Sequence, residues 1–141
     1  MSTGPATAVA VTFVWLGMVL AISFLEAPLK FRAPGVTLQI GLGIGRLVFR
    51  ALNTVEGCLA LLVVAIVVAV PMPARFTVAF SVAVAALAIQ LIAVRPRLTR
   101  RSDEVLAGAG GPRSRAHYAY IALEAVKAVA LLVAGILLLA G

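Results

Sequence analysis

Four apolar runs of about 20 residues, separated by short polar segments, constrain this chain more than any other feature of its sequence. A helix rises about 1.5 Å per residue, so each run matches a hydrocarbon core about 30 Å thick. The runs predict membrane spans at about residues 6–25, 47–70, 76–95 and 117–140. Only 12% of the residues are charged, which excludes a water-soluble domain. We therefore predict an all-α polytopic membrane protein, with residues 1–141 forming one antiparallel bundle of four transmembrane helices.

The distribution of basic residues predicts the orientation of the bundle. Ten of the 12 Lys and Arg residues lie in the predicted loops 26–46 and 96–116 or within four residues of them. Cytoplasmic loops carry an excess of Lys and Arg, so both loops are expected in the cytoplasm and both termini outside. The same bias explains the net charge of +7 without a nucleic-acid partner. These ten residues are Lys30, Arg32, Arg46, Arg50, Arg95, Arg97, Arg100, Arg101, Arg113 and Arg115.

The six arginines from Arg95 to Arg115 are expected to set topology and to contact anionic lipid headgroups. The composition is rich in Ala, Val and Gly, and Arg outnumbers Lys, which indicates a GC-rich genome. We therefore expect a multi-pass protein of a bacterial inner (plasma) membrane.

Ionisable residues inside membrane spans are costly, so their positions are the most informative feature of this chain. Four polar residues of the fourth span fall within an arc of about 80°, and four of the second within about 120°. With an acidic residue at the exit of the first span, both stripes are expected to meet as one buried polar cluster. Its predicted members are Glu26, Arg46, Arg50, Asn53, Glu56, His117, Tyr120, Glu124 and Lys127.

Two interpretations of this cluster remain open at the level of sequence. In the first, the charges pair with one another and fix the register of the helices, because an unpaired ion in lipid is costly. In the second, the carboxylates and His117 bind a cation or relay protons. One His and one Cys, Cys58, provide neither a closed zinc site nor bis-His haem ligation. No catalytic residue, metal ligand or cofactor is predicted.

Proline and glycine positions predict where the helices break or pack closely. Pro28 and Pro34 are expected to interrupt regular helix, and Pro96 to end the third helix. A separate short helix is expected to begin at residues 102–104 and to end at residues 108–112. Gly41 and Gly45 form a small-x-x-x-small pair, which predicts close approach of another helix. If residues 36–70 form one helix, its length predicts a kink at these glycines or a strong tilt.

Three short motifs support a resemblance to a known family. They are a Pro-x-x-Phe exit from the first span (Pro28 to Phe31), a glycine-rich entry to the second that ends in Phe49, and His117 early in the fourth. This pattern resembles an uncharacterised family of small four-helix membrane proteins, distantly akin to the animal membrane protein associated with cisplatin resistance. The resemblance implies a four-helix fold and a membrane location, and it implies no reaction.

Three classes of function are compatible with these features. The preferred one is a non-catalytic accessory or scaffolding subunit that packs against a larger membrane complex. The first alternative is a small oligomeric exporter or proton-coupled carrier that uses the polar cluster, and the second is a lipid-modifying membrane enzyme. The expected partners are the lipid bilayer, anionic headgroups, and either another membrane protein or further copies of this chain.

Overall fold

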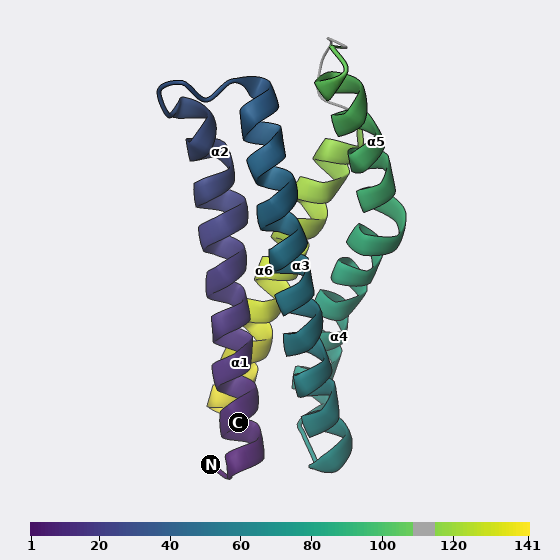
Figure 1. Cartoon of the computed structure of the whole chain (residues 1–141). Coiled ribbons are helices and arrows are strands. Elements are labelled where there is room, and N and C mark those ends of the chain that lie inside the picture. The colour runs from purple at the N-terminus through teal and green to yellow at the C-terminus, as the bar shows by residue number, and fades with distance from the viewer. Residues whose placement is uncertain (109–114) are drawn as a thin grey trace.

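The computed structural model is all-α and describes residues 1–108 and 115–141. Four helices are long and apolar enough to cross a membrane: Thr3–Arg32, Leu38–Ala69, Ala74–Leu106 and Arg115–Ala140. Consecutive helices run in opposite directions, and both termini lie at one end of the bundle, here called the terminal end (Figure 1). The opposite end carries most of the arginines and is called the basic end. A multi-pass membrane protein is therefore the class that the fold supports.

The first long helix continues through Pro28 instead of ending before it. It comprises α1 (Thr3–Val19), the π-helical segment η1 (Leu20–Glu26), the single turn α2 (Ala27–Leu29) and the 3-10 turn η2 (Lys30–Arg32). Proline lacks an N–H and crowds the carbonyl four residues earlier, and the wider π-helical turn before Pro28 changes that register. Gly35 then adopts a φ of +83°, a left-handed conformation that glycine tolerates, and the chain reverses there.

The second long helix, α3 (Leu38–Ala69), is one uninterrupted helix of 32 residues. The hydroxyl of Thr37 accepts a hydrogen bond from the N–H of Ile40 and caps its first turn. At about 1.5 Å per residue the helix is about 48 Å long, which exceeds a hydrocarbon core. Gly41 and Gly45, where a kink is one expectation, lie inside this helix. The excess length extends the helix toward the basic end.

The third long helix also runs further than predicted. It comprises α4 (Ala74–Ile89), the π-helical segment η3 (Gln90–Val94) and α5 (Arg95–Leu106). The predictions that Pro96 ends this helix and that a separate helix begins at residue 102 are wrong. Pro96 lies in the first turn of α5, directly after η3, where its missing N–H costs little. Gly108, with a φ of +101°, follows the end of α5, and residues 109–112 of the predicted stop lie outside the described residues.

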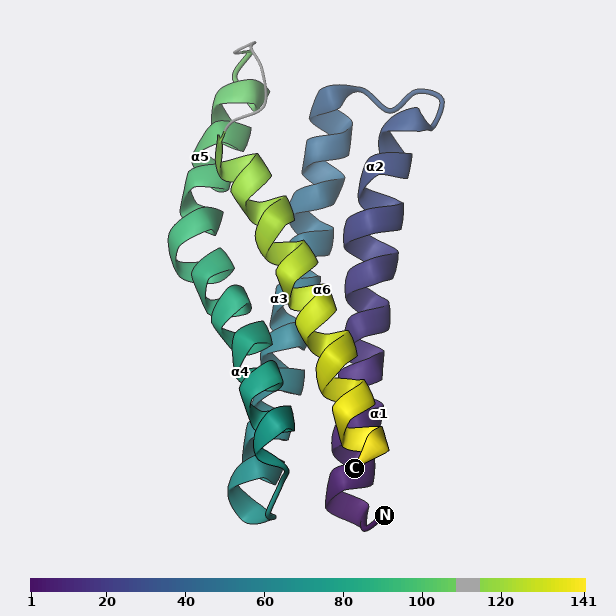
Figure 2. The same ribbon diagram turned by 180° about the vertical axis from the view of Figure 1, so that it is seen from behind.

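Aromatic residues fill the apolar core toward the terminal end. Trp15 of α1 is fully buried and meets Phe80 of α4 edge to face, with ring centroids 5.7 Å apart. Phe76 is also fully buried and stacks on Phe80 at 5.6 Å. The last helix, α6 (Arg115–Ala140), starts beside α5 and crosses the bundle to end beside α1 (Figure 2). This oblique path brings its polar stripe against the other three helices midway along the bundle.

Candidate functional site

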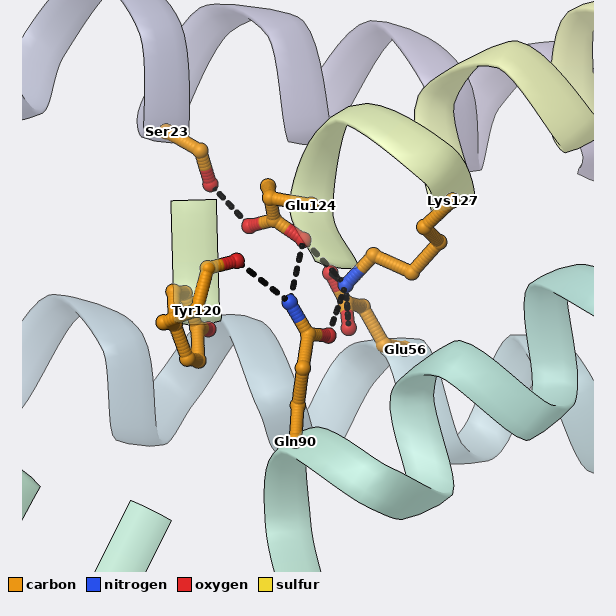
Figure 3. Close-up of polar contacts among 6 residues, drawn as sticks. All are labelled: Ser23, Glu56, Gln90, Tyr120, Glu124 and Lys127. Carbon is orange, nitrogen blue, oxygen red and sulfur yellow. Dashed lines mark hydrogen bonds and ion pairs between the residues drawn. The ribbon is translucent and has the colours of Figure 1, made fainter. Parts of the chain in front are cut away.

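A largely buried polar network lies midway along the bundle, centred on the ammonium group of the fully buried Lys127 (Figure 3). Lys127 Nζ donates to both carboxylate oxygens of Glu56, at 2.9 and 2.8 Å, and to Gln90 Oε1 at 3.0 Å. It also lies 2.5 Å from Glu124 Oε1. The three N–H groups of the lysine are thus shared among four acceptor oxygens, so no donor is left for an added ligand.

Glu124 connects this ion pair to the first helix. The hydroxyl of Ser23, in η1, donates to one carboxylate oxygen, and Gln90 Nε2 donates to the other at 3.2 Å. Gln90 Nε2 also reaches the backbone carbonyl of Tyr120, at 3.3 Å. The network therefore includes a side chain from each of the four long helices, and it holds them at one level of the bundle.

The structure brings three of the predicted cluster residues into direct contact, namely Glu56, Glu124 and Lys127. Two members of the network, Ser23 and Gln90, are absent from the predicted cluster, which contains polar residues of the second and fourth spans and Glu26 only. Gln90 gave a usable signal, because it is an amide within an otherwise apolar run. Ser23 gave none, since a single hydroxyl in a helix often bonds to its own backbone.

Asn53 and Tyr120 are buried between this network and the basic end. The ring of Tyr120 meets Phe49 edge to face, with centroids 5.8 Å apart. Within the described part of the chain, neither Asn53 Oδ1 nor the Tyr120 hydroxyl has a hydrogen-bond partner that meets ordinary geometry. Both are members of the predicted cluster, and neither side chain forms a hydrogen bond with Glu56 or Lys127.

The remaining predicted cluster residues lie apart from the network, so the single cluster expected from sequence is divided. Glu26 Oε2 lies 3.8 Å from Lys30 Nζ, one turn further along the first helix. Arg46 pairs with Asp103 of α5 and donates to the carbonyl of Thr99 at 3.2 Å. This separation follows from the extension of α5, which carries an acidic residue to the side of α3.

Arg50 and Arg95 line a cavity at the basic end, between α3 and the η3–α5 segment. His117 is half-buried, and its ring meets that of Tyr118 edge to face at 5.7 Å. The arginines expected at headgroups otherwise lie on the surface of this end, where Arg101 also pairs with Glu104 at 3.3 Å. The exposed or partly exposed members are Arg97, Arg100, Arg101 and Arg115, and Arg113 lies outside the described residues.

The two glycines predicted to admit another helix face side chains at the end of the first long helix. A Cβ added to Gly41 would lie 2.1 Å from the ring of Phe31, and one added to Gly45 would lie 3.0 Å from Lys30 Nζ. Phe31 and Lys30 both belong to η2, so the space left by the glycines is filled by the end of the first long helix. The glycines therefore serve packing within this chain.

Within residues 1–108 and 115–141, no group of three or more His, Cys, Asp or Glu side chains is arranged to hold a metal ion. In the buried network each carboxylate already accepts hydrogen bonds from neighbouring donors, so the network links the helices to one another. Comparison with family models, with curated proteins and with solved structures found no match to this chain. The family resemblance thus stays a prediction.

Proposed function

We propose that this protein is a non-catalytic integral membrane subunit that packs against a larger membrane complex. The observation that carries the proposal is an apolar groove of about 460 Å³ on the outer face of α4 and α6. Alanines and valines line it, and small residues allow a second helix to approach closely in a membrane. The lining residues are Ala79, Val82, Ala125, Val126, Val129, Ala130 and Val133.

The buried network supports the same proposal, because its donors and acceptors are used within the chain. A carrier needs a water-accessible route to its ionisable groups, and Glu56, Glu124 and Lys127 are each no more than 1% exposed. Neither the groove nor the cavity at the basic end is lined by these three residues. We infer that the network keeps the four helices in register while the groove receives a transmembrane helix of the partner.

The proposed orientation places the basic end in the cytoplasm and the terminal end outside, in the inner membrane of a bacterium. The support is the excess of Lys and Arg at one end of the bundle. In this orientation the partner helix lies against the middle of α4 and α6, within the hydrocarbon core.

Filling the groove is expected to release the partner while leaving the bundle folded. Ala125→Phe places a ring in the groove, and the exposed Ala65 on α3 offers a matched control, Ala65→Phe, away from it. We expect the tagged wild-type protein and the control, extracted in mild detergent from their own membranes, to carry a larger stoichiometric partner by native mass analysis. The amount of partner recovered with Ala125→Phe should fall at least about tenfold. Loss of one well-packed contact costs about 1.4 kcal/mol or more, which corresponds to a tenfold loss of affinity. A homo-oligomer with nothing attached would contradict the proposal.

A second candidate function, a proton-coupled carrier, is favoured by the charge count of the network. Two carboxylates face one ammonium group, so one additional proton makes the network neutral. If the network carries protons, Glu124→Gln should abolish proton uptake into proteoliposomes, measured with an enclosed pH-sensitive dye. Glu104→Gln, an exposed carboxylate of α5, is the control and should keep the wild-type rate. Equal rates for the two variants would exclude Glu124 as the proton site.

A further inference from the structure

A cavity of about 560 Å³ opens at the basic end, between α3 and the segment formed by η3 and α5. Three arginines and one aspartate contribute to its walls, so the recess is strongly charged. Its lining residues are Arg46, Arg50, Asn53, Thr54, Leu91, Arg95, Thr99 and Asp103.

The arginines of this cavity differ in whether they are already paired. Arg46 is held by Asp103 and by the carbonyl of Thr99. Arg50 and Arg95 form no salt bridge or side-chain hydrogen bond with any described residue. With three cations and one anion, the lining has a formal charge of +2, and two guanidinium groups are left without a counter-ion.

A buried amide lies in the wall of the same cavity. Asn53 is only 8% exposed, and its Oδ1 has no hydrogen-bond partner of ordinary geometry among the described residues, although the Tyr120 hydroxyl lies beside it. Because the oxygen and nitrogen of an amide exchange places by rotation, Asn53 can present either a donor or an acceptor to the cavity. A buried polar group without a partner is costly unless a ligand completes the site, and this cost applies to Asn53. The exposed Arg50 and half-buried Arg95 supply positive charge beside it.

The depth of the cavity corresponds to the level of lipid phosphates. Arg50 is about 28 Å from the end of α3 at Ala69, and Arg95 is about 31 Å from the start of α4 at Ala74, at 1.5 Å per residue. With Ala69 and Ala74 taken as the level of the opposite headgroups, both distances match the hydrocarbon thickness and place the two arginines where the apolar core meets the headgroups of the basic end. Arg97 and Arg100 lie on α5 and are exposed, as Arg50 is, but they do not line the cavity.

We propose that this cavity is a binding site for a phosphate group, held by Arg50 and Arg95 with Asn53 at its inner wall. A guanidinium group presents parallel N–H donors that match two oxygens of a phosphate. The pairing of Arg46 with Asp103 fixes one rim of the cavity and leaves the other two arginines for the ligand. The source of the phosphate is either the headgroup of a phospholipid or a free phosphate ion. This proposal does not depend on the accessory function.

Native mass analysis of the purified full chain tests the site with two probes, phosphatidylglycerol in mixed micelles and inorganic phosphate. The Arg50→Gln/Arg95→Gln variant removes both unpaired arginines, and Arg97→Gln/Arg100→Gln removes the same charge outside the cavity. We expect the Arg50→Gln/Arg95→Gln variant to bind whichever probe the wild type binds about 25-fold more weakly, at about fivefold per arginine. The second should change binding less than about threefold, because it loses only the diffuse attraction of the surface.

Leu91→Trp provides a variant that keeps every charge but fills the cavity, and it is expected to lose the probe as well. Binding of phosphatidylglycerol alone identifies a lipid headgroup as the ligand, and binding of inorganic phosphate identifies a free ion. Equal weakening by the two double variants would overturn the proposal, because surface charge would then account for the binding. Retention of the probe by Leu91→Trp, or binding of neither probe to the wild type, would overturn it too.

Discussion

Lys127→Met is expected to destabilise the bundle by about 3–5 kcal/mol, because it leaves the carboxylate of Glu56 buried without a counter-charge. Lys127 supplies both recorded hydrogen bonds to that carboxylate. Glu124 would keep its bonds from Ser23 and Gln90, so the loss falls mainly on Glu56. The change should be measured as the free energy of unfolding in a denaturing-detergent titration. The single tryptophan, fully buried Trp15, provides the fluorescence signal.

A second substitution separates the effect of an unpaired charge from that of altered packing. Replacing Glu56 as well, in Lys127→Met/Glu56→Met, removes the orphaned carboxylate and should recover more than half of the lost stability. Arg97→Met removes a cation from the exposed surface of α5 and is expected to change stability by less than about 0.5 kcal/mol. Wild-type stability in Lys127→Met would show that the network does not hold the helices together.

Phe76→Ala is expected to destabilise the bundle by about 3 kcal/mol through the cavity that it opens in the aromatic core. Phe76 is fully buried and stacks on Phe80, which in turn meets Trp15. The value is placed at the lower end of the range for core Phe→Ala changes. In a membrane the loss of van der Waals contacts lowers stability, whereas the transfer of the apolar ring out of water contributes little, because the unfolded helices are also in lipid.

The matched control for this substitution is Phe24→Ala, which removes the same atoms from a ring that is 42% exposed. It should cost less than about 1 kcal/mol, since surrounding lipid replaces most of the lost contacts. Both variants retain Trp15, so the same fluorescence titration applies. Equal losses for the two variants would mean that the aromatic residues at the terminal end do not form a specifically packed core.

The helices themselves follow from local chemistry, and their ends do not. Apolar runs of membrane length are sufficient to predict four helices and approximate positions for them. Pro28 is expected to interrupt regular helix and Pro96 to end one, but each follows a π-helical turn that accommodates the proline ring, and the helix continues past both. Such a turn depends on how a helix packs against its neighbours, and no residue pattern in this chain predicts it.

The candidate site shows the same division. Glu56, Glu124 and Lys127 were predictable, because ionisable groups in lipid must find partners and the spacing along two helices limits the choice. Ser23 and Gln90 join them only because α6 crosses the bundle at an angle and meets the other helices there. The pairing of Arg46 with Asp103 likewise requires α5 to continue past Pro96 alongside α3.

Hydrophobic length, charge distribution and helical period are properties of the chain, so they were sufficient for the class of fold and for most of the buried charges. Contacts between helices depend on tilt, rotation and the position of π-helical turns, which result from the packing of all the side chains at once. Only the folded bundle therefore separates the buried network from the arginine cavity, places Phe31 against Gly41, and leaves Arg50 and Arg95 without a salt bridge to any described residue.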